Sequence, residues 1–381
     1  MTRMFAAWLA ASLAVTATAG AQELKLTKPA VRLAHQFSGI NGFRELSDGR
    51  VLVADGIDDV VLRIDLATGK IDTLGRAGPG PGEYKSPDGL FALPNDATLL
   101  VDLGNARMSV FDGTGKHRES FPIAQGQPGA GPGPVPLIFP RGTDSRGRIY
   151  FQPVGGGGDS GSVVRWDRAA ARFDTVAKVK LPPLITRTSG GPNSRNVRQQ
   201  PPPYPVQDNW AVAPDGRVAL IRAPGYRVDW AAAGGRTTGK PIPAPPVPVR
   251  AAEKKEFMAE SAANGLSVSI ENNNGQVSMR FARGRRDDDG DEPDTEGMEW
   301  PAAKPPFTGT SAVGPDGRLW VERSVAANAP RSYDLIGPAG DVVGRVVAPV
   351  GRRLIGVGAK GAYFRHVDAD GISYLERYDV R

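Results

Sequence analysis

Eight polar or charged residues recur at corresponding places along this chain, each near the end of an apolar run that follows a tight turn. Their types suit the binding of small charged molecules, since arginine can grip a carboxylate or a phosphate with two parallel hydrogen bonds. We predict that they converge in one ring. Such a ring could bind an anionic or zwitterionic ligand, but a ring of salt bridges that satisfy one another is the favoured interpretation. The eight residues are Asp55, Asp102, Gln152, Arg222, Glu322, Arg323, Arg365 and His366.

The scarcity of cysteine and histidine narrows the chemistry further. The chain has no cysteine and three histidines, which excludes disulfides, thiolate metal sites and cysteine nucleophiles. A lyase site built on zinc is disfavoured for the same reason. The acidic run from Asp287 to Glu292 offers oxygen ligands, but it lacks the register and the distal glutamate of an EF-hand. We expect a solvated loop there and no cofactor, with Ca²⁺ kept as the alternative.

A tight turn followed by an apolar run occurs six times, and this recurrence predicts the fold. The turns have the sequences DGR at 48–50, NDA at 95–97, SRGR at 145–148, DGR at 215–217, DGR at 316–318 and AKG at 359–361. Aspartate, asparagine and glycine supply the backbone geometry of such turns. Another strand-length run follows each copy. Antiparallel units of four strands, repeated every 40 to 50 residues or so, are typical of β-propeller blades.

The sixth copy lacks an outer strand, because the run YLERYDV at 374–380 is followed only by Arg381. The run from Val31 to Phe37 has no nearby partner and can supply that strand. We therefore predict an all-β fold: a six-bladed propeller of four-stranded antiparallel blades, closed by an N-terminal strand, with one short helical insertion. Residues 22–381 are expected to form one domain.

The second blade carries a resemblance to a known family. Asp102, Asn105 and Arg107 form a D-x-x-N-x-R pattern after the loop GPGPGEYKSPDGL at 78–90, which resembles the NHL repeat. At the level of the fold, nearly the whole mature chain is similar to exported bacterial six-bladed propellers of the NHL-like and TolB-like kind. In NHL-like repeats the aspartate and the arginine hold the loop through charge-assisted hydrogen bonds. The resemblance thus implies a structural role for these three residues. It implies no single function, because one fold hosts many activities.

Two insertions interrupt the repeats. Residues 181–207 are rich in proline and arginine, and we expect a long basic loop without helix or central strand. Residues 240–307 begin with a proline-rich run and continue with a predicted amphipathic helix at 250–264, the strand-like VSMRF at 277–281 and the acidic run. Both insertions join an outer strand to the next inner strand. They are therefore expected to crowd the mouth of the channel at which the second strands end.

The first 21 residues are predicted to be a cleaved signal peptide. Arg3 precedes an apolar segment at 4–15, and Ala19-Gly20-Ala21 has the small-x-small form of a cleavage site. The apolar segment is shorter than the roughly 20 residues that a membrane span needs. We expect a periplasmic or secreted protein without a membrane span. The net charge of +6 comes from scattered residues without an aromatic–basic motif, so no nucleic-acid partner is expected.

These observations favour an exported, non-catalytic and monomeric propeller that binds a protein, a peptide or a small anionic ligand on its insertion-covered face. The alternative is a metal-dependent hydrolase or lactonase of the six-bladed type, in which a cation on the axis polarises the substrate carbonyl. Glu322 and Asp55 could serve such a cation, but the sequence places no asparagine beside them.

Overall fold

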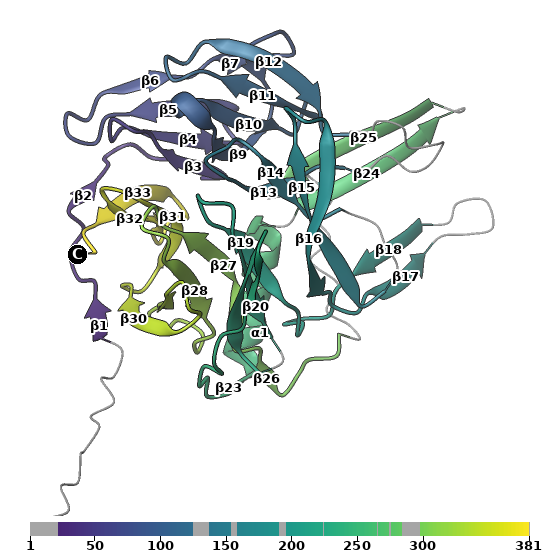
Figure 1. Cartoon of the computed structure of the whole chain (residues 1–381), viewed down its shortest axis with the longest axis vertical. Coiled ribbons are helices and arrows are strands. Elements are labelled where there is room, and N and C mark those ends of the chain that lie inside the picture. The colour runs from purple at the N-terminus through teal and green to yellow at the C-terminus, as the bar shows by residue number, and fades with distance from the viewer. Residues whose placement is uncertain are drawn as a thin grey trace, which may run out of the picture.

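Antiparallel sheets arranged in a ring make up most of the structure (Figure 1). The computed structural model describes residues 22–124, 137–153, 158–189, 196–223, 225–264, 266–273, 276–283 and 298–380. Six of its sheets are blades, and one helix, α1 (Ala251–Asn264), occurs in the described ranges. The predicted six-bladed β-propeller is confirmed.

Each blade runs outward from an inner strand near the axis of the ring. Blade 1 consists of β3 (Gly42–Glu45), β4 (Val51–Asp55), β5 (Val60–Ile64) and β6 (Ile71–Thr73). Blade 2 consists of β9 (Pro87–Ala92), β10 (Thr98–Asp102), β11 (Arg107–Phe111) and β12 (His117–Pro122). Blade 3 consists of β13 (Pro140–Thr143), β14 (Ile149–Phe151), β15 (Ser160–Asp167) and β16 (Arg172–Lys180).

The second half of the ring repeats this order. Blade 4 consists of β19 (Asn209–Val212), β20 (Val218–Arg222), β21 (Arg227–Ala232) and β22 (Gly235–Thr237). Blade 5 consists of β27 (Phe307–Val313), β28 (Leu319–Arg323), β29 (Ser332–Ile336) and β30 (Val342–Val347). Blade 6 consists of β31 (Arg352–Gly358), β32 (Gly361–Val367), β33 (Ser373–Tyr378) and β2 (Val31–Arg32).

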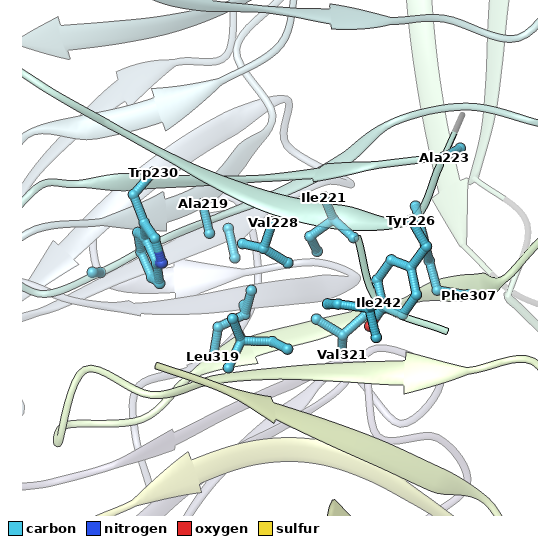
Figure 2. Packing of buried hydrophobic residues seen from close by; sticks show 13 residues of the cluster. Ala219, Ile221, Ala223, Tyr226, Val228, Trp230, Ile242, Phe307, Leu319 and Val321 are labelled. Carbon is cyan, nitrogen blue, oxygen red and sulfur yellow. The ribbon is translucent and has the colours of Figure 1, made fainter. Parts of the chain in front are cut away.

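The hydrophobic core is divided among the interfaces between neighbouring blades. Figure 2 shows the interface of blades 4 and 5, where Trp230, Val228 and Ile221 pack against Leu319 and Val321. A buried cluster of the same kind lies at each of the other blade interfaces, including the one that joins blade 6 to blade 1. Burial of each such side chain stabilises the fold by about 1.5–3 kcal/mol. The inner strands also contact one another all the way round the ring.

The N-terminal segment closes the ring as predicted. Strand β2 pairs antiparallel with β33, the Leu33 N–H donates to the Leu375 carbonyl at 3.0 Å, and Phe37 bridges to Ser373. An additional strand was not predicted: β1 (Gln22–Lys25) lies parallel to β30 as a fifth strand of blade 5. In Figure 1 the purple β1 and β2 accordingly lie beside yellow strands. One short segment therefore holds two blades.

The recurrent turns have a common structure that explains their sequence. Gly49, Gly216 and Gly317 have φ angles of 87°, 87° and 78°, a conformation that glycine adopts without a steric penalty. In each DGR turn the aspartate accepts the N–H of the arginine, at 2.9, 2.9 and 3.0 Å. The turn of blade 2 has no glycine, and Asn95 and Asp96 take positive φ angles instead.

The insertions differ in part from the prediction. Residues 181–207 are not one loop, because β17 (Ile185–Ser189) and β18 (Asn196–Gln200) form a two-stranded antiparallel sheet. The prolines of this insertion all lie outside the two strands, so they do not interrupt the hydrogen bonds between them. This sheet stands apart from the blades.

The second insertion contains the predicted helix, α1, and the predicted strand VSMRF lies within β25 (Gln276–Arg283), which pairs with β24 (Leu266–Asn273). Strands β23 (Val247–Pro248) and β26 (Ala303–Lys304) join the two ends of the insertion. A short parallel pair, β7 (Arg76–Ala77) and β8 (Glu83–Tyr84), precedes blade 2. The acidic run at 287–292 and the predicted signal peptide lie outside the described residues. Across the described ranges, no helix is long and apolar enough to cross a bilayer.

Candidate functional site

The eight predicted site residues all lie near the ends of second strands, at one end of the propeller. Asp55 ends β4, Asp102 ends β10, Gln152 follows β14, Arg222 ends β20, Glu322 and Arg323 end β28, and Arg365 and His366 lie near the end of β32. We call this end, where the inner strands also begin, the capped end. Corresponding positions thus share one end, but the contacts of the eight residues differ.

Asp102 is fully satisfied within blade 2. Its buried carboxylate accepts hydrogen bonds from the Lys85 N–H at 2.8 Å, the Asn105 side chain at 2.8 Å and the Arg107 Nε at 2.9 Å. The other nitrogens of Arg107 donate to backbone carbonyls of the loop at 79–83. The D-x-x-N-x-R residues therefore hold the loop, as the resemblance implied.

Asp55 occupies the same place in blade 1, but none of the described residues places a cation beside it. Its buried carboxylate accepts the backbone N–H groups of Gly39, Ile57 and Asp58 at 3.0, 3.1 and 3.2 Å. Burial raises the pKa of Asp55, and these hydrogen bonds oppose the rise. The carboxylate organises a turn without being neutralised.

Gln152 and Arg222 are engaged by neighbouring side chains. The Gln152 amide oxygen accepts the indole N–H of Trp210, in the next blade, at 3.2 Å. The Arg222 guanidinium binds Asp208 at 2.5 Å and Asp229 at 3.2 Å. Both acids are buried side chains of blade 4 and the strand-linking residues before it. The Gln152–Trp210 contact and the hydrogen bond from Arg222 to the Lys178 carbonyl, at 3.1 Å, join blades 3 and 4.

Arg323 and His366 face buried acids of their own blades. Arg323 binds Asp334 at 2.7 Å. His366 Nδ1 lies 3.4 Å from Glu376 Oε1, and Arg352 binds the other oxygen of Glu376 at 3.1 Å. Burial, followed by the charge of Arg352, lowers the pKa of His366. Ligand binding by these residues stays a prediction, although their strongest contacts are within the fold.

Glu322 stands closer to the centre of the capped end. Its carboxylate is fully buried, and its Oε1 accepts Arg331 at 2.5 Å and the Thr308 hydroxyl at 3.3 Å. Its Oε2 accepts no hydrogen bond from the described residues, and Arg353 Nε lies 3.8 Å away from it. One oxygen of this carboxylate is therefore unsatisfied within the described structure.

Arg365 differs from the other seven residues. It lies directly opposite Arg353 in the pairing of β32 with β31, and like charges in that arrangement repel. Arg353 binds Thr310 at 3.4 Å and Glu260 at 3.5 Å, whereas the side chain of Arg365 makes no hydrogen bond or ion pair to any described residue. Burial, then the charge of Arg353, lowers the pKa of Arg365.

Arg141 is an inner-strand residue that the sequence analysis missed. The register of β13 shifts between Pro140 and Gly142, so Arg141 is the extra residue of a β-bulge, a feature that redirects a side chain. Its Nη2 donates to Asn209 Oδ1 at 2.5 Å, and the guanidinium lies over the Trp210 ring at 4.7 Å. Solvent reaches Arg141, yet the surrounding protein lowers its pKa to about 10.

Inner-strand bulges are a shared feature of this end. The registers of β9, β27 and β31 shift near Asp88, Thr308 to Thr310 and Ile355, as that of β13 does at Arg141. The sequence contained a signal for Arg141, because the starts of inner strands lie at the same end of the propeller as the ends of second strands. Aligning both sets, rather than second strands alone, would have brought Arg141 and Arg353 into the candidate list.

The two insertions join in one cap. Tyr204, from the first insertion, packs against Phe257 and Trp300 of the second, with ring centroids 5.0 and 6.3 Å away. Its hydroxyl donates to the Glu253 carbonyl at 2.6 Å. We call residues 201–207, α1 and 298–306 the cap.

Helix α1 attaches the cap to the propeller. Glu260 of α1 accepts hydrogen bonds from Arg331 and pairs with Arg353 at 3.5 Å. Arg353 lies on the innermost strand of blade 6. The cap therefore reaches the innermost strands at the capped end, as the sequence predicted for the second insertion. In the described ranges no three His, Asp or Glu side chains gather in a metal-binding arrangement.

Comparison with models of protein families and with curated proteins gives no match. Solved structures similar to the chain include a gluconolactonase from Xanthomonas campestris, with 11% identity and a TM-score of 0.42 over 92% of this chain and 94% of that chain. A virginiamycin B lyase from Staphylococcus aureus has 12% identity and a TM-score of 0.40 over 91% and 97%. A member of the duf4221 family from Bacteroides vulgatus has 8% identity and a TM-score of 0.42 over 94% and 96%. The fold itself follows from the strand pairing.

Proposed function

We propose that this protein is a binding protein whose ligand is held at the centre of the capped end, between the cap and the inner strands. The observation that carries the proposal is the attachment of Glu260, on α1, to Arg353, on the innermost strand of blade 6. A helix tied across the start of an inner strand covers the place where propeller ligands are most enclosed. Bulged inner strands at this end supply side chains directed away from the regular pleat.

The binding function is proposed to be non-catalytic. Arg141 and Arg365, cations at this end that form no ion pair with a described carboxylate, carry guanidinium groups, which are permanent hydrogen-bond donors and cannot exchange a proton near neutral pH. They suit recognition of an anionic group better than general acid–base chemistry. A small anionic ligand or the acidic end of a peptide fits these donors, and the protein is proposed to act as a monomer.

Glu322 keeps a second function open, that of a metal-dependent hydrolase or lactonase. Its Oε2 is a buried carboxylate oxygen without a hydrogen bond from the described residues, which is the type of ligand that Ca²⁺ accepts. In the described structure its nearest partners are arginines rather than further acids. The two functions differ in whether the purified protein carries a metal.

Export completes the proposal. It is supported by the signal-peptide pattern of residues 1–21 and by the similarity of the D-x-x-N-x-R blade to NHL-like and TolB-like propellers. Strand β1 starts at Gln22, the residue that would follow the cut. Sequencing the N-terminus of the protein from an exporting host should give Gln22 as the first residue, and retention of residues 1–21 in the native cell would contradict export.

Ligand screening followed by hydrogen–deuterium exchange tests the location of binding. A library of sugars, lactones, amino acids, organic acids, phosphates and short peptides is screened for compounds that raise the Tm. The hits are then mapped by deuterium exchange. We expect protection of 250–264 and 352–354, with none at the 316–318 turn of the opposite end. Protection only at the opposite end, or no hit from any class, would overturn the proposal.

Metal analysis separates the two functions. The protein is purified without chelator and its Ca²⁺ and Zn²⁺ contents are measured together with lactone hydrolysis, for the native chain and for Glu322→Gln. We expect no stoichiometric metal and no hydrolysis in either. One metal ion per chain, with hydrolysis lost in Glu322→Gln, would establish the hydrolase instead.

A further inference from the structure

Two guanidinium groups at the capped end form no ion pair with a carboxylate of the described residues. The side chain of Arg365 makes no hydrogen bond or ion pair to these residues, although the charge of Glu260 acts on it and opposes the lowering of its pKa. Arg141 makes hydrogen bonds to the Asn209 side chain and the Trp210 carbonyl, but no carboxylate of the described residues pairs with it. Arg365 is half-buried, and burial is the first cause that lowers its pKa, so its charge is costly unless an opposite charge joins it. Arg141 is exposed, with its guanidinium held over Trp210 and against Asn209, where an anion can reach it.

The surrounding charges do not compensate for these two arginines. Arg331 and Arg353 share the carboxylates of Glu260 and Glu322, so that local set is balanced without Arg365. In blades 1 and 2, the Asp55 carboxylate is occupied by three backbone N–H groups. Asp102 is paired with Arg107, and Asp88 is buried.

The two arginines form separate points of attachment. Arg141 belongs to blade 3 and Arg365 to blade 6, which are opposite one another in a ring of six. Arg365 lies opposite Arg353 in blade 6, whereas Arg141 contacts Asn209 and Trp210 of blade 4, so the two guanidinium groups have different neighbours. Each can therefore receive an anionic group of its own, and a ligand with two anionic groups can contact both.

We propose that the capped end binds a small organic dianion, with one anionic group at Arg365 and Arg353 and the other at Arg141. The second group would be held against Arg141 beside the Trp210 ring and the Asn209 side chain. Carboxylates and phosphates share the chemistry that a guanidinium fork recognises. This inference rests on the proposed function, because it names the ligand class of the same site.

Calorimetric titration with a chain-length series tests the proposal. The probes are succinate, glutarate, adipate and pimelate, with butanoate, pentanoate and hexanoate as singly charged controls and inorganic phosphate as a compact anion. One dicarboxylate of matching length should bind about tenfold more tightly than the monocarboxylate of the same length, since a charge-assisted contact contributes about 1.4 kcal/mol or more. Affinity should fall as salt is added.

Substitutions at each arginine separate the two points. Arg141→Gln and Arg365→Gln should each reduce dicarboxylate affinity about tenfold, and only Arg365→Gln should weaken monocarboxylate binding. Arg318→Gln is the matched control, because Arg318 is an exposed arginine paired with Asp316 in a turn at the opposite end. Arg141→Lys and Arg365→Lys keep the positive charge but lose the forked guanidinium, so they should bind the dicarboxylate with intermediate affinity. They replace a glutamine variant that does not fold.

Three results would contradict the proposal that the ligand is a dianion. Unchanged affinity in Arg141→Gln removes the second point, equal affinity for mono- and dicarboxylates removes the need for two anionic groups, and a phosphate affinity equal to the best dicarboxylate assigns a compact anion instead. If no dicarboxylate binds below about 10 mM, the inference fails. The broader proposal still stands in that case when deuterium exchange places an uncharged ligand under the cap.

Discussion

Blade 2 and blade 6 use the same strand end in opposite ways. At the end of β10, Asp102 receives donors from three residues and is neutralised by Arg107. At the corresponding end of β32, Arg365 faces another arginine, Arg353, and has no partner among the described residues. The repeat places a charged residue at the same end of both blades. A residue whose charge is paired within its own blade stabilises the fold. A residue whose charge is not paired there is available to a ligand.

We expect blade 6 to be as stable as blade 2, although its outer strand comes from the other end of the chain. Deleting residues 22–38 tests this most severely, because it removes β1 and β2 together with the buried Leu26, Leu33 and Phe37. We expect a loss of about 5 kcal/mol or more in the free energy of unfolding, which approaches the whole stability of a domain.

Thermal unfolding of the deletion variant measures this loss, with the chain starting at Gln22 as the control. A drop of the Tm over the whole transition is expected, without a separate early step. An unchanged Tm would show that the N-terminal segment does not stabilise the ring. Blade 6 could then not be compared with blade 2 as a complete four-stranded blade.

Asp102→Asn tests the paired charge in blade 2. The substitution keeps the shape of the side chain and removes the charge that neutralises Arg107, and one amide hydrogen then faces donors. Breaking a buried pair on one side costs about 3 kcal/mol. Urea unfolding should show this loss, whereas Asp316→Asn, in an exposed turn pair, should lose less than about 1 kcal/mol. Similar losses in the two variants would mean that Asp102 is not a special support.

The unsatisfied side is tested by Arg365→Met. Removing one of two opposed arginines relieves a repulsion, so the free energy of unfolding should stay the same or rise by up to about 1 kcal/mol. Anion binding should be lost at the same time. Urea unfolding and titration with the best anion measure the two effects. A loss of stability as large as that of Asp102→Asn would show that Arg365 supports the fold, and the contrast between the blades would disappear.

The fold could be predicted from the sequence because it depends on local and repeated information. The DGR turns at 48–50, 215–217 and 316–318 encode hairpins through the positive φ of one glycine. The need for an outer strand in blade 6 follows from counting strands. By contrast, β1 pairs with β30 more than 300 residues later in the sequence, and its exposed residues carry no apolar alternation that would announce a strand.

The candidate site was only partly predictable because its chemistry depends on which charges meet. The sequence brought Glu322 and Arg365 to the right end of the ring. It did not show that Asp102 would be neutralised by Arg107 while Arg365 would face Arg353, since that depends on the strand pairing of blade 6. The position of Arg141 depends on a bulge in β13, and a bulge leaves little trace in the pattern of apolar residues.

Asp55 gives the finest test, because it lies between the two extremes. It has backbone donors, as Asp102 has, but no cation, and burial raises its pKa. An acid whose pKa is higher in the folded than in the unfolded chain favours the folded state when protonated. Its ionisation therefore lowers stability as the pH rises from about 3.9, the unfolded value, through the raised pKa of the folded state.

Asp55→Asn removes that ionisation, but its single amide oxygen can replace only one carboxylate oxygen, so the amide NH2 faces the N–H of Gly39 or those of Ile57 and Asp58. This mismatch costs about 1 kcal/mol at every pH. Because only the native chain ionises, the stability of the variant relative to the native chain should be lowest below about pH 4 and should rise as the pH increases through the raised pKa of Asp55. Urea unfolding of both proteins across this range measures the difference. A loss at pH 7 as large as that of Asp102→Asn would mean that the carboxylate charge stabilises blade 1 without a cation. In that case the presence of an oppositely charged partner would no longer distinguish structural residues from ligand-binding residues at the capped end.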